Sequence, residues 1–189
     1  MCGICGIYNY KNQSKIDRAI VDNMLKKIAH RGPDGFDSVD LGDVVLGFNR
    51  LSFLDLQGGM QPFSNEDNTV YVICNGEIFN FKELTSELTA KGHKFKTKTD
   101  TEVVVHLYEE LGMDCLSQLN GQFAVAIYDT KIKTLFLARD QIGICPLFYT
   151  IHDGKVIFAS EIKAILEYPG VPRKLNMKAV DQLMNYPGV

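Results

Sequence analysis

Several features that would define a function class are missing from this chain of 189 residues. No apolar stretch approaches the roughly 18 residues that a membrane-spanning helix needs. No basic segment followed by an apolar run and a small-residue cleavage site marks a secretory signal. The chain also lacks a basic excess: its net charge is −3, whereas nucleic-acid-binding domains normally carry positive charge. We therefore expect neither a membrane nor a nucleic acid among its partners.

The number and spacing of the cysteines do not fit a disulfide framework. There are five cysteines, an odd number, and their spacing does not pair them. This predicts a reducing, cytoplasmic setting. Beyond the first two cysteines, the cysteines and the four histidines show neither a Cys-x-x-Cys nor a His-x-x-x-His spacing. The sequence therefore predicts no metal site.

The remaining composition is that of a globular protein, with 46% apolar and 23% charged residues, and the length supports one sizeable core. Apolar, β-rich runs predict strands over 2–10, 43–56 and 69–80, and four short strands between 122 and 160. Periodicity and end signals predict helices from Ser14 to about Gly32 and over 81–92, 99–112 and 160–168. Strands and helices do not alternate regularly, so the order favours an α+β fold with two stacked antiparallel sheets covered by helices.

Residues 168–189 differ from the rest of the chain. "YPGVPRKLN" is a linker punctuated by proline and glycine, and "MKAVDQLMNY" has the apolar spacing of a short amphipathic helix. We interpret 168–189 as a linker and helix that lead into a further, C-terminal domain. A helix that docks back onto the same domain is the alternative that the pattern leaves open.

The opening stretch "MCGICGIYNY" places a cysteine directly after the initiator methionine. A metal or redox pair of Cys2 and Cys5 is disfavoured, because side chains three residues apart on a strand point to opposite faces. An ordinary buried cysteine remains open. The third interpretation is a nucleophile. Removal of Met1 would give Cys2 a free α-amino group with a pKa of about 8, which can accept the thiol proton near neutral pH.

The motifs "MCGI", "HRGPDG", "RLSFLD", "NGEIFN", "TDTEVV", "LNGQFAVAIYD", "LARDQIGICPLFY" and "FASEIKAIL" follow one another in this order. Together they resemble the N-terminal glutaminase domain of glutamine-dependent asparagine synthetases, which are class II glutamine amidotransferases with the N-terminal-nucleophile (Ntn) hydrolase fold. The resemblance covers about residues 2–167, so we assign 1–167 to such a domain. It implies a four-layer αββα sandwich of two antiparallel sheets, in agreement with the fold class above.

The resemblance also implies a catalytic set. Cys2 would be the nucleophile and its α-amino group the general base. The side-chain amide of Asn75 and the backbone N–H of Gly76 would form the oxyanion hole, although an Asn-Gly pair alone would also predict a turn. His30 is interpreted as part of a loop that frames the pocket, with a role as general base as the weaker alternative.

The same resemblance implies residues that bind the substrate. Arg50 would pair with the α-carboxylate, for which a planar guanidinium is suited. Asp100, together with Glu77, would hold the α-ammonium end, and the backbone around Phe53 and Leu54 would line the pocket. The simpler alternatives are a surface arginine at position 50 and an N-cap of the following helix at position 100.

The implied reaction is hydrolysis of L-glutamine to glutamate and ammonia, with no cofactor for this step. In asparagine synthetase-like proteins the ammonia passes to a C-terminal domain in cis that activates aspartate with ATP and Mg²⁺. The Ser-Gly-Gly-type phosphate loop of such a domain does not occur in this sequence. A homodimer is a further expectation. Two alternatives stay open: ammonia transfer to another acceptor, such as a surface-polysaccharide sugar, and a non-catalytic glutamine-sensing module.

Overall fold

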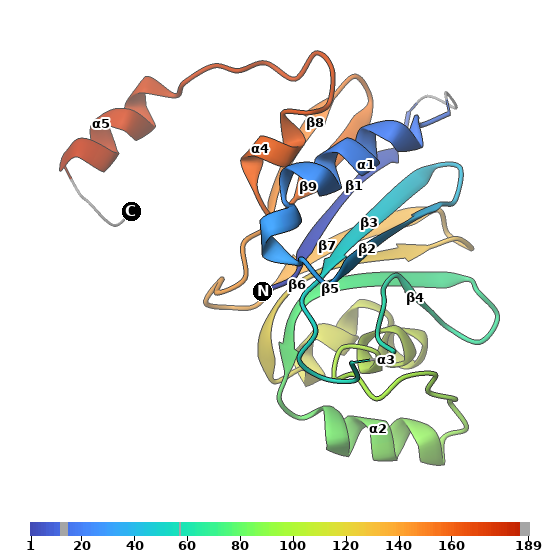
Figure 1. Ribbon diagram of the computed structural model, residues 1–189. Helices are drawn as coiled ribbons and strands as arrows, with labels where there is room; N and C mark the ends of the chain where they lie inside the picture. The colour runs from blue at the N-terminus through green and yellow to red at the C-terminus, as the bar shows by residue number, and fades with distance from the viewer. Residues whose placement is uncertain (12–14, 57, 186–189) are drawn as a thin grey trace.

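A computed structural model of the chain describes residues 1–11, 15–56 and 58–185, and its strands form two antiparallel sheets (Figure 1). The first sheet has the order β2-β3-β1-β9-β8 and the second the order β4-β5-β6-β7. The strands of the first sheet are β1 Gly3–Asn9, β2 Gly35–Asp40, β3 Val44–Arg50, β8 Phe148–His152 and β9 Lys155–Ala159. Those of the second are β4 Phe63–Ser64, β5 Val70–Ile78, β6 Gly121–Asp129 and β7 Thr134–Arg139.

Helices cover the outer face of each sheet, which gives four layers (Figure 1). The first sheet is covered by α1 Arg18–Lys27 and α4 Ile162–Ile165, with the 3₁₀ turn η1 Ala29–Arg31 after α1. The second sheet is covered by α2 Phe81–Ala90 and α3 Val103–Leu111, followed by the 3₁₀ segment η2 Gly112–Gln118. The predicted αββα sandwich is confirmed.

The central strands are buried on both faces, which explains their nearly continuous apolar sequence. On β1, Ile4 packs between the sheets while Cys5 and Ile7 pack against α1 and α4. On β5, Ile73 packs between the sheets and Val72 packs against the helices of the opposite side. Because successive side chains of a strand alternate between faces, only a strand covered on both sides needs apolar residues at every position.

Two helix starts differ from the sequence prediction. Ser14 lies outside the described residues, and α1 is instead capped by Asp17, whose side chain accepts a hydrogen bond of 3.0 Å from the backbone N–H of Ala19. The helix predicted over 99–112 begins at Val103, after Glu102 in the N-cap position. The N-cap alternative for Asp100 is therefore wrong. The same helix ends, as predicted, at a glycine with positive φ, Gly112.

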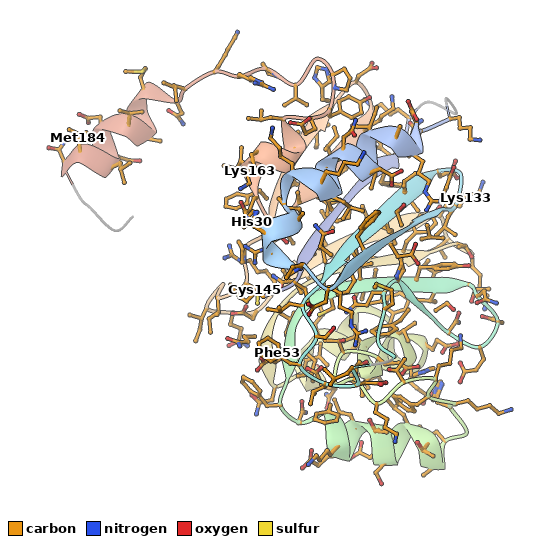
Figure 2. All side chains as sticks on the ribbon, in the orientation of Figure 1. His30, Phe53, Lys133, Cys145, Lys163 and Met184 are labelled. Atoms are coloured by element: carbon orange, nitrogen blue, oxygen red, sulfur yellow. The ribbon has the colours of Figure 1, made fainter. Side chains whose placement is uncertain are left out.

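The last described helix, α5 Met177–Asn185, lies away from both sheets (Figure 1), and Met184 marks its far end in Figure 2. None of the residues within Met177–Asn185 is buried. The alternative in which this helix docks back on the same domain is therefore wrong. Among the described residues, no helix combines the length and the apolar character that crossing a membrane requires.

Candidate active site

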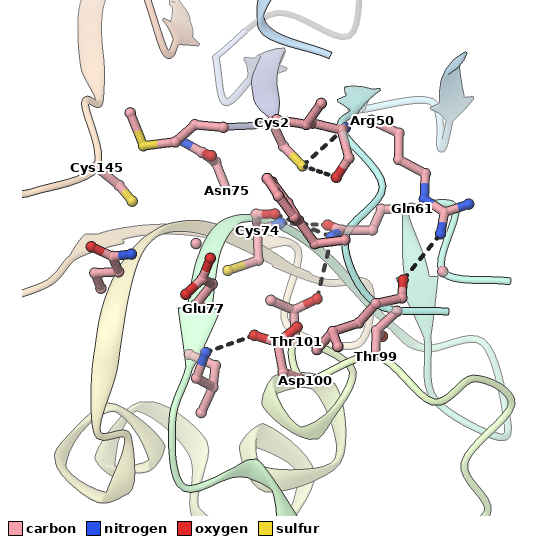
Figure 3. Close-up of a pocket in the computed structure, with 18 of the residues that line it drawn as sticks. Cys2, Arg50, Gln61, Cys74, Asn75, Glu77, Thr99, Asp100, Thr101 and Cys145 are labelled. Atoms are coloured by element: carbon pink, nitrogen blue, oxygen red, sulfur yellow. Dashed lines mark hydrogen bonds between the residues drawn. The ribbon is translucent and has the colours of Figure 1, made fainter. Parts of the chain in front are cut away.

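A cavity of about 450 Å³ opens at the ends of β1 and β3, against the middle of β5 (Figure 3). This volume lies in the range of roughly 300–1,000 Å³ that small-molecule sites occupy. All eight residues predicted for the site line this cavity: Cys2, Arg50, Phe53, Leu54, Asn75, Gly76, Glu77 and Asp100. They come from four separate parts of the sequence, so their convergence is a result of the fold.

Cys2 directly precedes β1 and faces the turn that leaves β3. The pairing of Gly3 with Asn49 places the cysteine beside the end of β3. The backbone N–H of Leu51 points at the Cys2 sulfur at 3.4 Å, and the thiol lies 3.6 Å from the Leu51 carbonyl oxygen. The Arg31 guanidinium donates a 2.9 Å hydrogen bond to the Cys2 carbonyl oxygen. The cysteine is thereby held at its sulfur by Leu51 and at its carbonyl group by Arg31.

Burial and nearby positive groups act in opposite directions on the pKa of the Cys2 thiol. Burial raises the pKa of Cys2, while the Leu51 N–H, the positive N-terminal amine and the Arg50 guanidinium act in the opposite direction. In the structure this amine belongs to Met1, which also lines the cavity and is 55% exposed. Removal of Met1 would place the amine on Cys2 itself, directly beside the sulfur.

One edge of β5 supplies a row of backbone groups to the cavity wall. Alternate residues of a strand direct their N–H and C=O groups to the same edge. On this edge the Cys74 N–H donates to the side-chain oxygen of Gln61 at 2.6 Å, and the Cys74 C=O accepts from the side-chain nitrogen of Gln61 at 3.1 Å. Further along the same edge, the Ile78 N–H donates to the Asp100 carboxylate at 2.7 Å. Gly76 lies between them, so its N–H points to the same edge and towards the cavity.

Asn75 carries a buried amide that is distinctive for its hydrogen bonding. The residue is 1% exposed. Among the residues that the structure describes, neither its Nδ2 nor its Oδ1 has a hydrogen-bond partner. Buried amides are nearly always hydrogen-bonded, because an unpaired buried donor or acceptor costs about 1–3 kcal/mol. An amide held in this way beside a cavity is suited to donate to a ligand.

Gly76 is also required by packing. A Cβ atom at this position would lie 2.2 Å from the Gln122 carbonyl oxygen and 2.6 Å from the Phe123 Cα. The paired strand β6 therefore leaves no room for a side chain. The Asn-Gly pair lies within a strand, so the alternative that it forms a turn is wrong.

Arg50 is buried although it carries a charge, with 7% of its surface exposed. Its Nη2 donates to the backbone carbonyl oxygens of Leu54 and Asp55, which orients the guanidinium along the cavity wall (Figure 3). A side chain at Gly59 would lie 2.4 Å from Thr99 and 3.2 Å from the guanidinium. The alternative of an ordinary surface arginine is therefore wrong.

Asp100 and Glu77 bring two carboxyl groups to the same end of the cavity (Figure 3). Burial raises the pKa of Asp100, hydrogen bonds from backbone N–H groups oppose the rise, and the nearby charge of Glu77 adds to it. A cation bound between them would relieve this repulsion. Phe53 and Leu54, at 74% and 46% exposure, lie at the mouth of the cavity.

Comparisons with known proteins agree with this geometry. The chain matches the glutamine amidotransferase domain family over residues 1–188. The chain belongs to this family. It is 44% identical over 180 residues to the glutamine-hydrolysing asparagine synthetase 2 of Bacillus subtilis (strain 168), covering 94% of this chain and 24% of that protein. It is 42% identical to asparagine synthetase 2 of Oryza sativa subsp. japonica, with 87% and 28% covered. The domain thus spans about a quarter of the length of these curated relatives.

Solved structures show the same fold for this glutamine amidotransferase domain. The glutamine phosphoribosylpyrophosphate amidotransferase of B. subtilis superposes with a TM-score of 0.71 at 24% identity, over 86% of this chain and 42% of that one. A structure described as the allosteric regulatory enzyme of purine biosynthesis gives 0.73 at 24% identity, with 88% and 43% covered. These likenesses support the Ntn-hydrolase fold that the sequence predicted.

The amidotransferase domain also uses residues that sequence reasoning missed. Leu51 contacts the Cys2 sulfur through both its N–H and its C=O, and Gln61 satisfies both backbone groups of Cys74. Leu51 could have been found from its position directly after Arg50, whereas nothing in the local sequence marks Gln61. His30 does not line the cavity and lies 2.8 Å from the Glu161 carboxylate. That placement fits a loop that frames the site and leaves a role as general base without support.

Proposed function

We propose that this domain hydrolyses the side-chain amide of L-glutamine to glutamate and ammonia with Cys2 as the nucleophile. Membership in the glutamine amidotransferase family and the position of Cys2 in the cavity support this proposal. The observation that carries it is the buried, unpartnered Asn75 amide in the same cavity as the thiol. A binding module that only senses glutamine has no need for an uncompensated donor beside a thiol.

The reaction begins with proton transfer within the terminal residue. After removal of Met1, the α-amino group of Cys2 accepts the thiol proton, and the sulfur attacks the amide carbon of glutamine. The oxygen of the tetrahedral intermediate is held by the Asn75 amide and the Gly76 N–H. The protonated amine gives its proton to the departing ammonia. Water, activated by the same amine, then hydrolyses the glutamyl thioester and frees the sulfur.

The cavity offers complementary charges for the two ends of the substrate. The Arg50 guanidinium, oriented by two carbonyl oxygens, binds the α-carboxylate. Asp100 and Glu77 bind the α-ammonium group, which neutralises two neighbouring carboxylates. The exposed backbone at Phe53 and Leu54 contacts the bound amino acid at the mouth of the cavity.

The ammonia is destined for an asparagine synthetase-type domain in cis, with aspartate as acceptor and with ATP and Mg²⁺ used only there. Two observations support this part of the proposal. The matched relatives are named asparagine synthetases and are three to four times longer than the match. In addition, α5 leaves Met177, Leu183 and Met184 exposed at 57–80%. The glutaminase step itself uses no cofactor.

A cytoplasmic location and a homodimeric assembly complete the proposal. All five cysteines are free thiols, in keeping with a reducing compartment. Homodimer formation rests on the expectation from the resemblance, and the molar mass in solution tests it.

The deciding experiment follows the Cys2 sulfur directly. Protein whose N-terminal residue is verified by mass as Cys2 is treated with a chloroketone analogue of glutamine, and the N-terminal peptide is analysed. We expect one covalent adduct on Cys2 and loss of glutamate release. The Cys145→Ala variant is the matched control, because Cys145 lines the same cavity. The proposal fails if correctly processed protein forms no adduct at Cys2, or if Cys2→Ala still releases glutamate.

A further inference from the structure

Four metal-binding side chains meet in a part of the domain that the glutaminase reaction does not use. Glu66 lies in the loop between β4 and β5, His93 follows α2, and His106 and Glu109 lie on α3. One ligand atom from each residue lies within 4.8 Å of the corresponding atom of every other residue. None of the four lines the glutamine cavity.

Four distances within this cluster are close to the ligand-to-ligand spacing of a tetrahedral metal ion. Nδ1 of His93 lies 3.5 Å from Glu66 Oε1 and 3.6 Å from Glu109 Oε2. Nδ1 of His106 lies 3.5 Å from Glu66 Oε2 and 3.5 Å from Glu109 Oε2. A tetrahedral zinc ion with bonds of about 2.0–2.2 Å holds its ligand atoms about 3.4 Å apart. Glu66 makes its two contacts through different oxygens, and the four ligand atoms all lie within 4.8 Å of one another, so the side chains are gathered at nearly the spacing that an ion requires.

His106 supplies an independent reason for a ligand at this point. Its side chain is 0% exposed, and within the described part of the chain neither ring nitrogen has a hydrogen-bond partner. A buried imidazole without a partner is costly. Coordination through Nδ1 removes that cost on the side that faces the cluster.

The outer face of each histidine is directed at a further carboxylate. Nε2 of His93 lies 3.3 Å from Glu110, which is also paired with Lys91, and Nε2 of His106 lies 3.9 Å from Glu102. Histidines that bind metals commonly point their second nitrogen at a carboxylate, which sets the tautomer and the ring orientation.

The two candidate carboxylate ligands are also held in place. Glu66 accepts a 2.7 Å hydrogen bond from the backbone N–H of Lys94, and Glu109 Oε1 accepts one of 2.8 Å from the Asn65 side chain. Both side chains are therefore oriented by hydrogen bonds from outside the cluster.

We propose that Glu66, His93, His106 and Glu109 form a structural zinc site. Two imidazoles favour zinc over the oxygen-seeking cations Mg²⁺ and Ca²⁺, and two carboxylates balance the charge of a divalent ion. Four protein ligands leave no open position for a reacting water, which is the arrangement of a structural site. The sequence predicted no metal site, and this proposal differs from that prediction.

Zinc at this position would fix one wall of the glutamine cavity. The ion joins the β4–β5 loop, the segment after α2 and α3 itself. The chain between His93 and α3 carries Thr99, Asp100 and Thr101, which line the cavity. Glu102 fastens the same segment by accepting from the backbone N–H groups of Lys96 and Thr97 at 2.7 and 2.8 Å. The metal thus acts as a clamp on the segment that presents Asp100.

The test measures Zn²⁺ binding without any use of glutamine. The chain with the Cys2→Ala substitution, which removes the half-buried thiol of the cavity, is freed of metal by chelation and titrated with ZnCl₂ by calorimetry, with melting temperature as a second readout. We expect one equivalent to bind and the melting temperature to rise. Because glutamate release is not measured, failure of the glutaminase proposal would not affect this result.

Single substitutions decide which residues bind the ion. His93→Asn and Glu109→Gln should weaken Zn²⁺ binding by more than the roughly 10- to 100-fold typical of an outer-sphere change. These residues are chosen because His106 is fully buried and its variants could unfold. The matched control is His152→Asn, a partly buried histidine on β8 that should leave Zn²⁺ affinity unchanged.

Cobalt distinguishes the ligand set. Co²⁺ bound to nitrogen and oxygen gives a tetrahedral visible spectrum without a sulfur-to-cobalt charge-transfer band, as we expect here. The proposal is overturned if Zn²⁺ neither binds nor raises the melting temperature, which would identify the cluster as histidines packed against carboxylates without a metal. It is equally overturned if His93→Asn binds as the parent does, or if the cobalt spectrum shows thiolate coordination.

Discussion

The substitution Asn75→Ala separates a catalytic role from a structural role more sharply than any other change in this domain. Removal of one oxyanion donor typically lowers kcat by about 10²–10³-fold, or about 2.7–4 kcal/mol of transition-state stabilisation. The Asn75 amide makes no hydrogen bond within the described residues, so its loss breaks none. Each buried unpaired polar group costs about 1–3 kcal/mol. Loss of the amide therefore relieves a penalty that offsets the lost packing.

The expected signature is a large fall in kcat with an unchanged melting temperature. Since the oxyanion forms only during the reaction, kcat and kcat/KM should fall by the same factor. Glutamate release under saturating glutamine measures kcat, and thermal unfolding measures the melting temperature. Both are compared with the parent protein carrying the same N-terminal Cys2.

Gln61→Ala provides the matched control, because it removes another buried amide from the same cavity. This amide bonds both backbone groups of Cys74 and reaches Thr101 at 3.4 Å. Its loss leaves two buried backbone groups unpaired, and we expect the free energy of unfolding to fall by about 2–6 kcal/mol. An unchanged kcat in Asn75→Ala, or destabilisation equal to that of Gln61→Ala, would refute the oxyanion assignment.

Two further substitutions test the walls of the site, and a third tests the ion pairs that Glu161 makes outside the cavity. Arg50→Leu should raise KM for glutamine far more than it lowers kcat; a defect in kcat alone would contradict carboxylate binding. Burial raises the pKa of Asp100, so KM should rise as the pH falls through that raised pKa, and Asp100→Asn should remove this pH dependence. Because its pKa is raised in the folded protein, ionised Asp100 lowers the free energy of unfolding at a pH above the pKa that it has in the unfolded chain. Asp100→Asn should therefore melt no lower than the parent at pH 7, and a lower melting temperature would contradict this. Burial opposes ionisation of Glu161, yet hydrogen bonds from its basic neighbours hold its pKa at about 2. The stabilisation that ionised Glu161 provides should be lost as the pH falls from about 4.5 towards 2. A Glu161→Gln variant that unfolds in acid with the same profile as the parent would exclude this stabilisation.

Local patterns along the chain were sufficient to predict much of the fold. The buried run at β1, the helix predicted over 81–92 and the glycine that ends α3 were all visible in the sequence. Apolar periodicity and end signals act over a few residues, so they survive without knowledge of the partner strands. β2 and β4 were missed, because β2 is only partly buried and β4 has two residues. Neither shows the apolar run or alternation that marks a longer strand.

The order of motifs was likewise sufficient to predict the family and eight of the residues that line the cavity. What those motifs could not supply was the register that places Gly3 opposite Asn49 and so brings Cys2 to Leu51. Antiparallel pairing joins segments that lie far apart in sequence, and no local preference specifies which residues face one another.

The same reason applies to Gln61 and to the proposed zinc site. Neither the amide that completes the β5 edge nor the meeting of Glu66, His93, His106 and Glu109 leaves a recognisable spacing in the sequence. The chain encodes the chemistry of these side chains residue by residue. Their distances arise only when two sheets and their covering helices pack, because packing alone brings remote segments to a common point.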